Sequence, residues 1–95
     1  MVEFSLGQTR RVMAGRASVW FAQPDDEWRE DLNQIVLVAR VEVACKGQTF
    51  GMVVFKDRPT DPVCGIRLQL LRLDEPDMGA SPPRTFRAYF RVTPE

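Results

Sequence analysis

The sequence predicts a mainly β fold, either a single antiparallel β-sandwich or a small, partly open β-barrel, with one short amphipathic helix over residues 25–33. Three observations support this prediction. Apolar and polar residues alternate along several short segments, as in strands that bury one face. Two of these segments flank a Lys46-Gly47 turn and fit each other in register. The 95 residues contain no internal repeat or linker, so residues 1–95 are expected to form one domain.

The segment from Ile35 to Lys56 is predicted to be the central hairpin. Its first half alternates apolar residues with Arg40 and Glu42, which is the pattern of a half-buried strand. Gly47, at the second position of a two-residue loop, supplies the positive φ that a type I′ turn needs. The pairs that this loop predicts are Val43 with Phe50, Val41 with Met52, and Ala39 with Val54. A shift by one residue would turn all of these side chains to the other face, so the register is well determined.

Shorter strands are predicted before this hairpin. Residues 2–6 alternate apolar and polar side chains and predict a first strand. Residues 9–13 and 17–22 flank a turn at residues 14–16 and predict a second hairpin, for which two registers fit.

Residues 25–33 are predicted to form the helix. Pro24 suits the position at which a helix begins, and the three acidic residues that follow lie where the helix dipole favours negative charge. Trp28 and Leu32 recur at helical spacing and are expected to pack on the sheet. A helix that continues to Cys45 is the alternative, but the β-branched residues in that stretch favour a strand.

Two further strands are predicted after the central hairpin. Residues 57–63 contain two prolines and are expected to form a loop, and residues 64–73 then resume the alternation. We expect this strand to pair antiparallel with the second strand of the central hairpin. The expected neighbours are Val54 with Ile66, Met52 with Leu68, and Phe50 with Leu70. After a polar loop over residues 74–83, the last strand is expected to turn Phe86, Ala88, Phe90 and Val92 inward.

The two cysteines are predicted to be free thiols. In the expected strand order, Cys45 lies at the central turn and Cys64 at the far end of the next strand pair. Their separation would be about 25 Å at ~3.4 Å per residue, whereas a disulfide needs α-carbons within roughly 7 Å.

Composition describes an ordinary globular chain. Apolar residues make up 44% and charged residues 27% of the sequence, and the net charge is zero. The balance argues against disorder and removes any general attraction to nucleic acid or to an anionic membrane. The sequence begins without a secretory signal pattern and contains no apolar run of roughly 20 residues. We therefore expect a cytoplasmic protein without a membrane partner.

The absence of histidine restricts the possible chemistry. It excludes the Ser-His and Cys-His nucleophile systems and leaves cysteine and carboxylates as metal ligands. No catalytic residue, metal site or cofactor is predicted. A carboxylate-dependent hydrolase that uses Asp57 and Asp61 is a remote alternative, because acidic residues beside prolines more often cap turns in a solvated loop.

Two regions of the outer face of the predicted sheet could bind a partner. Apolar residues would gather on part of the outer face, covered either by the helix or by another protein chain. This protein-interaction site comprises Val36, Val38, Val53, Phe55 and Leu71. The alternative is a nucleic-acid site in which arginines hold phosphates and a tyrosine stacks on a base. Its residues are Arg40, Arg67, Arg87, Tyr89 and Arg91.

The leading expectation is a non-enzymatic protein-interaction or assembly module, such as a small adaptor or structural protein of a bacterium or a phage. Its partner would be another protein or further copies of the chain. Nucleic-acid binding is the alternative and is not expected, because the chain is neutral and an acidic segment adjoins the candidate face.

Overall fold

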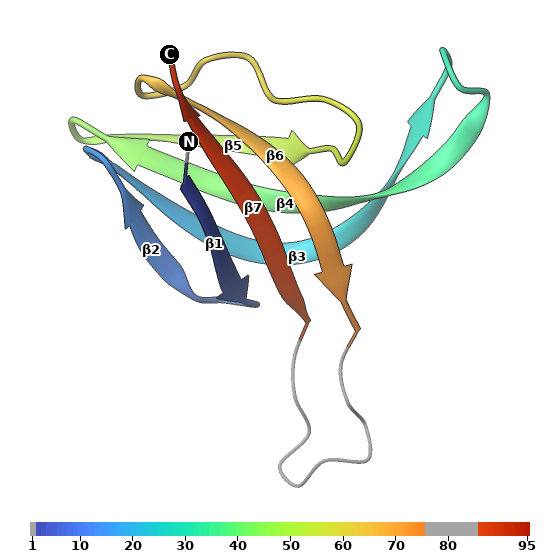
Figure 1. Cartoon of the computed structure of the whole chain (residues 1–95), viewed down its shortest axis with the longest axis horizontal. Coiled ribbons are helices and arrows are strands. Elements are labelled where there is room, and N and C mark those ends of the chain that lie inside the picture. The colour runs from blue at the N-terminus through green and yellow to red at the C-terminus, as the bar shows by residue number, and fades with distance from the viewer. Residues whose placement is uncertain (1, 76–85) are drawn as a thin grey trace, which may run out of the picture.

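The computed structural model describes residues 2–75 and 86–95, whose strands form two antiparallel sheets (Figure 1). Sheet A has the strand order β1-β7-β6, and sheet B has the order β2-β3-β4-β5. The strand bounds are β1 Val2–Gly7, β2 Arg11–Ala14, β3 Ala17–Arg29, β4 Gln34–Cys45, β5 Gln48–Val54, β6 Ile66–Asp74 and β7 Arg87–Pro94. The mainly β prediction is confirmed, and the sheets do not close into a barrel. Within the described residues there is no helix that is long and apolar enough to cross a membrane.

The core lies between the two sheets and is built from the side chains that alternate inward. Phe90 of β7 is fully buried at its centre. Its ring lies 5.5 Å from that of Phe4 and 6.3 Å from that of Phe21, the latter edge-on, as aromatic pairs prefer. Ala88, Phe90 and Val92 are all buried, as the alternation of the last strand predicts.

The central hairpin has the predicted register. Val43 pairs with Phe50, Val41 with Met52, and Ala39 with Val54. Lys46 and Gly47 both have positive φ, at 50° and 75°, as a type I′ turn requires.

The predicted helix over residues 25–33 is wrong, because β3 runs through Pro24 to Arg29 and pairs with the first half of β4. A register shift between Phe21 and Gln23 marks a bulge at the start of this stretch. Pro24 is tolerated because β2 pairs with β3 only as far as Trp20, so no neighbouring strand there needs an N–H from Pro24. The acidic residues and the proline suit a helix locally. In the folded protein, however, residues 23–29 pair in an unbroken register with residues 34–40 of β4.

The predicted pairing of β6 with β5 is also wrong, because β6 pairs with β7 in the other sheet. After β5 the chain crosses to sheet A and runs along the outer edge of β6. Phe55 O accepts a hydrogen bond from Leu70 N at 2.9 Å, and Thr60 N donates to Leu68 O at 2.8 Å. Alternation could not distinguish the two arrangements. It determines which side chains of residues 64–73 point inward, and these are the same whether the strand pairs with β5 or lies in the opposing sheet.

The prediction of free thiols is wrong, since Cys45 and Cys64 form a disulfide with α-carbons 6.1 Å apart. The estimated separation assumed that β6 pairs with β5. Instead, residues 55–65 return the chain to the end of the molecule where β4 finishes, so Cys64, in the turn before β6, lies beside Cys45. The bond therefore joins the last residue of β4 in sheet B to the turn that leads into β6 of sheet A. Of the predicted loop over residues 74–83, Asp74 and Glu75 are described, with Asp74 the last residue of β6, and the rest lies outside the described residues.

Candidate interaction surface

β3 and β4 continue past the other strands of sheet B as a two-stranded arm, which we define as residues 24–38. The last pair between β4 and β5 is Ala39 with Val54, so beyond this pair β4 has only β3 beside it. Figure 1 shows the arm curving away from the two sheets toward the right of the view. The arm therefore projects beyond the rest of sheet B.

Large apolar side chains are exposed near the end of the arm. Trp28 pairs directly with Ile35, and Leu37 follows two residues later on the same face. The exposed fractions are 56% for Trp28, 65% for Ile35, 40% for Leu37, and 44% for Leu32 in the turn. We call these four residues the tip surface. Among the described residues only Met13 and Phe50 are comparably large, apolar and exposed, so exposed apolar groups are concentrated on the arm.

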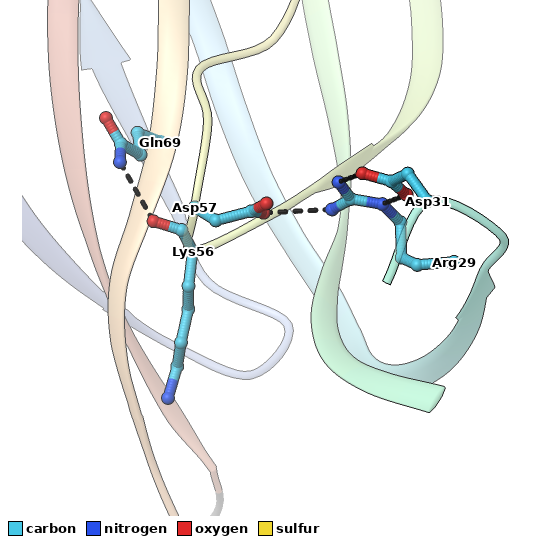
Figure 2. Close-up of polar contacts among 5 residues, drawn as sticks. All are labelled: Arg29, Asp31, Lys56, Asp57 and Gln69. Carbon is cyan, nitrogen blue, oxygen red and sulfur yellow. Dashed lines mark hydrogen bonds and ion pairs between the residues drawn. The ribbon is translucent and has the colours of Figure 1, made fainter. Parts of the chain in front are cut away.

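On the other face, Arg29 fixes the arm to the body of the protein (Figure 2). Its side chain is only 6% exposed. Nε and Nη2 donate to the carboxylate of Asp31 at 2.8 and 2.6 Å, and Nη1 donates to Asp57 Oδ1 at 2.9 Å. The guanidinium also lies 4.8 Å from the ring centroid of Phe55, a cation–π distance. Arg29 therefore connects the end of β3 to the segment that follows β5.

That segment is in turn attached to sheet A. Gln69 Nε2 of β6 donates to Lys56 O at 2.8 Å, beside Asp57 (Figure 2). Nearer the body, Arg40 Nε donates to Asp25 Oδ2, and Arg40 Nη2 lies 3.9 Å from Glu27 Oε2. These contacts hold the arm in one position and so favour a preorganised tip surface.

The arginines keep the neighbouring carboxylates ionised. Hydrogen bonds from Arg29 lower the pKa of Asp31 and of Asp57 below the ordinary value, and the bond from Arg40 does the same for Asp25. The same contacts raise the pKa of Arg29 and Arg40. A carboxyl group that acts as a general acid near neutral pH needs the opposite shift.

The five residues of the predicted interaction site fall in two places. Val36, Val38 and Val53 lie on the Arg29 side of sheet B by their register, with Val38 fully buried and the other two half-buried. Phe55 follows β5, and the guanidinium groups of Arg29 and Arg58 each lie 4.8 Å from its ring centroid. Leu71 belongs to sheet A, at the bulge of β6.

The chain itself supplies neighbours on this face, where the sequence suggested a helix or a partner. Arg29 shares the face with Val36 and Val38 and contacts Phe55 and Asp57, and Val38 is fully buried.

The predicted nucleic-acid residues are divided between the sheets. Arg67, Arg87, Tyr89 and Arg91 lie on β6 and β7 of sheet A, whereas Arg40 belongs to sheet B.

These residues also have internal partners. Arg91 lies 3.6 Å from Glu3, Arg87 donates to Ser5 Oγ at 3.0 Å, and the guanidinium of Arg72 lies 4.1 Å from the Tyr89 ring centroid. One face of the ring that was expected to stack on a base is therefore already occupied.

The carboxylates considered for hydrolysis are Asp57 and Asp61, of which Asp57 has an arginine partner. Asp57 is directed at Arg29. Across residues 2–75 and 86–95, no three His, Cys, Asp or Glu side chains come together as metal ligands would.

Sequence reasoning missed the tip surface because Trp28 and Leu32 were assigned to the buried side of a helix. The available signal was the alternation of Ile35 and Leu37, which indicates that this segment is a strand. A strand there could pair with residues 25–29 if these were extended as well. Comparison of the chain with protein-family models, with curated proteins and with solved structures finds no match.

Proposed function

We propose that this protein is a non-enzymatic interaction module that binds a protein partner through the tip surface of the β3–β4 arm. The observation that carries the proposal is the concentration of four large, exposed apolar side chains on a projecting hairpin. Exposed apolar groups gathered in one place mark interaction sites, and an aromatic anchor such as Trp28 is typical of the residues that dominate binding energy.

The charges around the tip surface indicate the chemistry of the partner. Asp26 pairs with Leu37 and shares the face of Trp28, and Glu30 is exposed in the turn. Neither carboxylate forms an ion pair with another described residue. An apolar patch with an anionic border fits a partner surface that is apolar at its centre and carries lysine or arginine at its rim.

The preorganisation of the arm supports the proposal as well. Because Arg29 and Arg40 already fix the arm, binding would not have to order a flexible hairpin, which would reduce the entropic cost of association.

The test compares a tip variant with a matched surface variant. Trp28→Ser combined with Ile35→Ser removes the anchor pair, and Met13→Ser removes an equally exposed apolar side chain, 64% exposed, on β2. Each protein is used as bait in cells of its source organism, and the bound proteins are quantified by mass spectrometry, while light scattering gives the mass of the free protein.

We expect one partner to be retained by the unmodified protein and by Met13→Ser and to be lost from the tip variant. If the partner is a further copy of the chain, the same pattern appears as a loss of oligomer mass. Equal behaviour of the two variants in both measurements would contradict the proposal.

The arginine face of sheet A is the second candidate site, for nucleic acid. Its support is weaker, because Arg91 lies beside Glu3, Arg72 covers Tyr89, and Arg40 belongs to the other sheet. Carboxylate-dependent hydrolysis at Asp57 has the least support. Arg29 lowers the pKa of this carboxyl group, whereas a general acid near neutral pH needs a raised pKa.

A further inference from the structure

β5 forms the free edge of sheet B. Lys46 and Gly47 make a two-residue turn, so the flanking residues Cys45 and Gln48 form a hydrogen-bonded pair. The alternation of an antiparallel ladder then directs the N–H and C=O groups of the odd-numbered residues of β5 away from β4. These residues are Thr49, Gly51 and Val53. None of their backbone groups has another backbone partner within the described part of the chain.

Two of the other three sheet edges offer less backbone for pairing than β5 does, and the remaining edge is β1, with six residues. The outer edge of β6 is covered by the chain between Phe55 and Thr60, and β2 is only four residues long. β5 has seven residues, contains no proline, and keeps an unbroken register with β4. A regular edge of this length is a template for pairing with another strand unless a charge, proline or bulge disrupts it.

Gly51 lies in the middle of this edge for no reason internal to the fold. Its φ is not positive, a Cβ placed there would meet no atom within 4 Å, and the β4–β5 register has no bulge. Glycine inside a strand is destabilising relative to alanine, because its backbone loses more conformational freedom on folding. Where glycine does not form a turn or bulge, its remaining use in a strand is to let another backbone or ligand approach closely.

A groove runs beside β5 and provides space for an added strand. Its volume is about 680 Å³, and it is lined by β5 and by the segment from Arg58 to Cys64. Phe50 and Met52 contribute apolar walls, and Arg58 and Asp61 contribute charge.

Cations flank the groove. Arg58 follows the end of β5 and Lys46 precedes its start, and neither forms an ion pair among residues 2–75 and 86–95. Within the groove lining Arg58 and Asp61 balance each other, and Lys46, just before the start of β5, adds one positive charge at the other end.

We propose that β5 is a strand-addition site that binds an extended segment of a partner protein, with carboxylates at the ends of that segment. The edge groups of Thr49, Gly51 and Val53 form the backbone hydrogen bonds, and Lys46 and Arg58 select the acidic ends. This site lies apart from the tip surface, so it stands or fails independently of the function proposed above.

A second copy of β5 is a poorer occupant. Antiparallel pairing centred on Gly51 would bring Lys46 of each copy toward residue 56 of the other, which is also lysine. Like charges directly opposite one another destabilise a strand pair.

Hydrogen exchange with a peptide probe tests the site without altering the protein. The probe is an acetylated, amidated heptapeptide that alternates valine with threonine between terminal glutamates, and the matched probe carries lysine at both ends. We expect the amides of Thr49, Gly51 and Val53 to exchange rapidly in the free protein and to become protected with the glutamate probe. The amides of Phe50 and Met52, already bonded to β4, should change little. Protection elsewhere, or none at a saturating peptide concentration, would overturn the proposal.

Affinity differences between probes and variants provide the second measurement. The glutamate probe should bind about tenfold more tightly than the lysine probe at low salt, as expected for a few exposed ion pairs. Gly51→Pro removes one outward N–H without removing a bond to β4 and should weaken binding about tenfold, whereas Gly51→Ala keeps that donor and should bind nearly as the unmodified protein does.

Two other results would contradict the inference: equal affinity of the two probes, or a stable dimer whose edge amides are already protected without peptide.

Discussion

Arg29 is the residue on which the position of the arm depends. It is the most buried charged side chain among the described residues, and its donors reach Asp31 on the same hairpin and Asp57 on the segment after β5. Replacing Arg29 removes the hydrogen bonds that Asp31 and Asp57 receive, although these exposed carboxylates can still bind water. The effect of the substitution should therefore appear in the arm before it appears in the core.

We expect Arg29→Met to lower the melting temperature and to accelerate amide exchange at Val36 and Val38 while leaving Phe90 protected. Arg58→Met is the matched control, because Arg58 also stacks on Phe55 at 4.8 Å but forms no ion pair with a described residue. Hydrogen exchange followed by mass spectrometry or NMR distinguishes the two variants. Equal acceleration in both would show that the carboxylate contacts do not fix the arm.

The same network predicts a dependence of stability on acid. The pKa values of Asp25, Asp31 and Asp57 are lowered in the folded protein by hydrogen bonds from Arg40 and Arg29. The resulting stabilisation is complete above the unfolded-state pKa and is lost as the pH falls through the folded-state values, below about pH 4. Denaturant titrations from about pH 7 down to about pH 2 measure the free energy of unfolding across this range. It should decline less with acid in Arg29→Met than in the unmodified protein, because the variant lacks the hydrogen bonds that lower these pKa values.

Phe90 tests the assignment of the inward and outward faces. It is fully buried against Phe4 and Phe21, so Phe90→Ala should lower the free energy of unfolding by about 3–5 kcal/mol. Arg87→Ala, on the exposed face of the same strand, should change it by less than about 1 kcal/mol, because it loses only a surface contact with Ser5. Chemical denaturation measures both, and similar losses would contradict the face assignment.

At the scale of elements, the β3–β4 hairpin and residues 55–65 determine one another's positions. A two-stranded hairpin is marginally stable alone in water, so the arm needs the contacts of Arg29 with the segment that follows β5. Residues 55–65 in turn carry the chain from sheet B to sheet A and bring Cys64 to Cys45. The disulfide closes a loop that contains β5 and most of this crossing segment, with a sequence separation of 19 residues.

Loss of the disulfide should lower the free energy of unfolding by about 3 kcal/mol, as expected from the entropy of closing a loop of this length. Chemical denaturation of the oxidised protein and of the Cys45→Ala/Cys64→Ala variant measures the difference. Thiol titration of the unreduced, unfolded protein should detect no free cysteine. Two free thiols per chain would contradict the pairing and the crossing of residues 55–65 between the sheets.

At the scale of the whole molecule, charge is separated although the total is zero. The arm carries most of the acidic residues of the first half of the chain, and sheet A carries Arg67, Arg72, Arg87 and Arg91. Two of these four arginines have carboxylates nearby, since Arg91 lies beside Glu3 and Arg72 beside Asp74. The protein therefore presents an acidic, apolar arm and a partly neutralised arginine face.

We expect no binding of single-stranded DNA in fluorescence anisotropy at low salt, because the arginine face is partly neutralised and the acidic arm repels phosphate. Tyr89→Ala serves as the matched variant. Binding that weakens steeply with salt and that falls by about 1–3 kcal/mol in Tyr89→Ala would instead favour the nucleic-acid alternative.

The sequence by itself determined the local strands and their faces. Alternation in residues 35–43 and 86–92, together with the positive φ of Gly47, predicted the central register and the inward set of β7, because these features depend only on neighbouring residues and one turn. Tertiary structure decided the rest. Residues 25–29 suit a helix start locally, yet β4 pairs them as a strand. Residues 64–73 satisfy alternation beside either sheet, so only the packing of two sheets placed β6 beside β7 and Cys64 beside Cys45. The tip surface followed from the first of these choices, because a strand exposes Trp28 where a helix would have buried it.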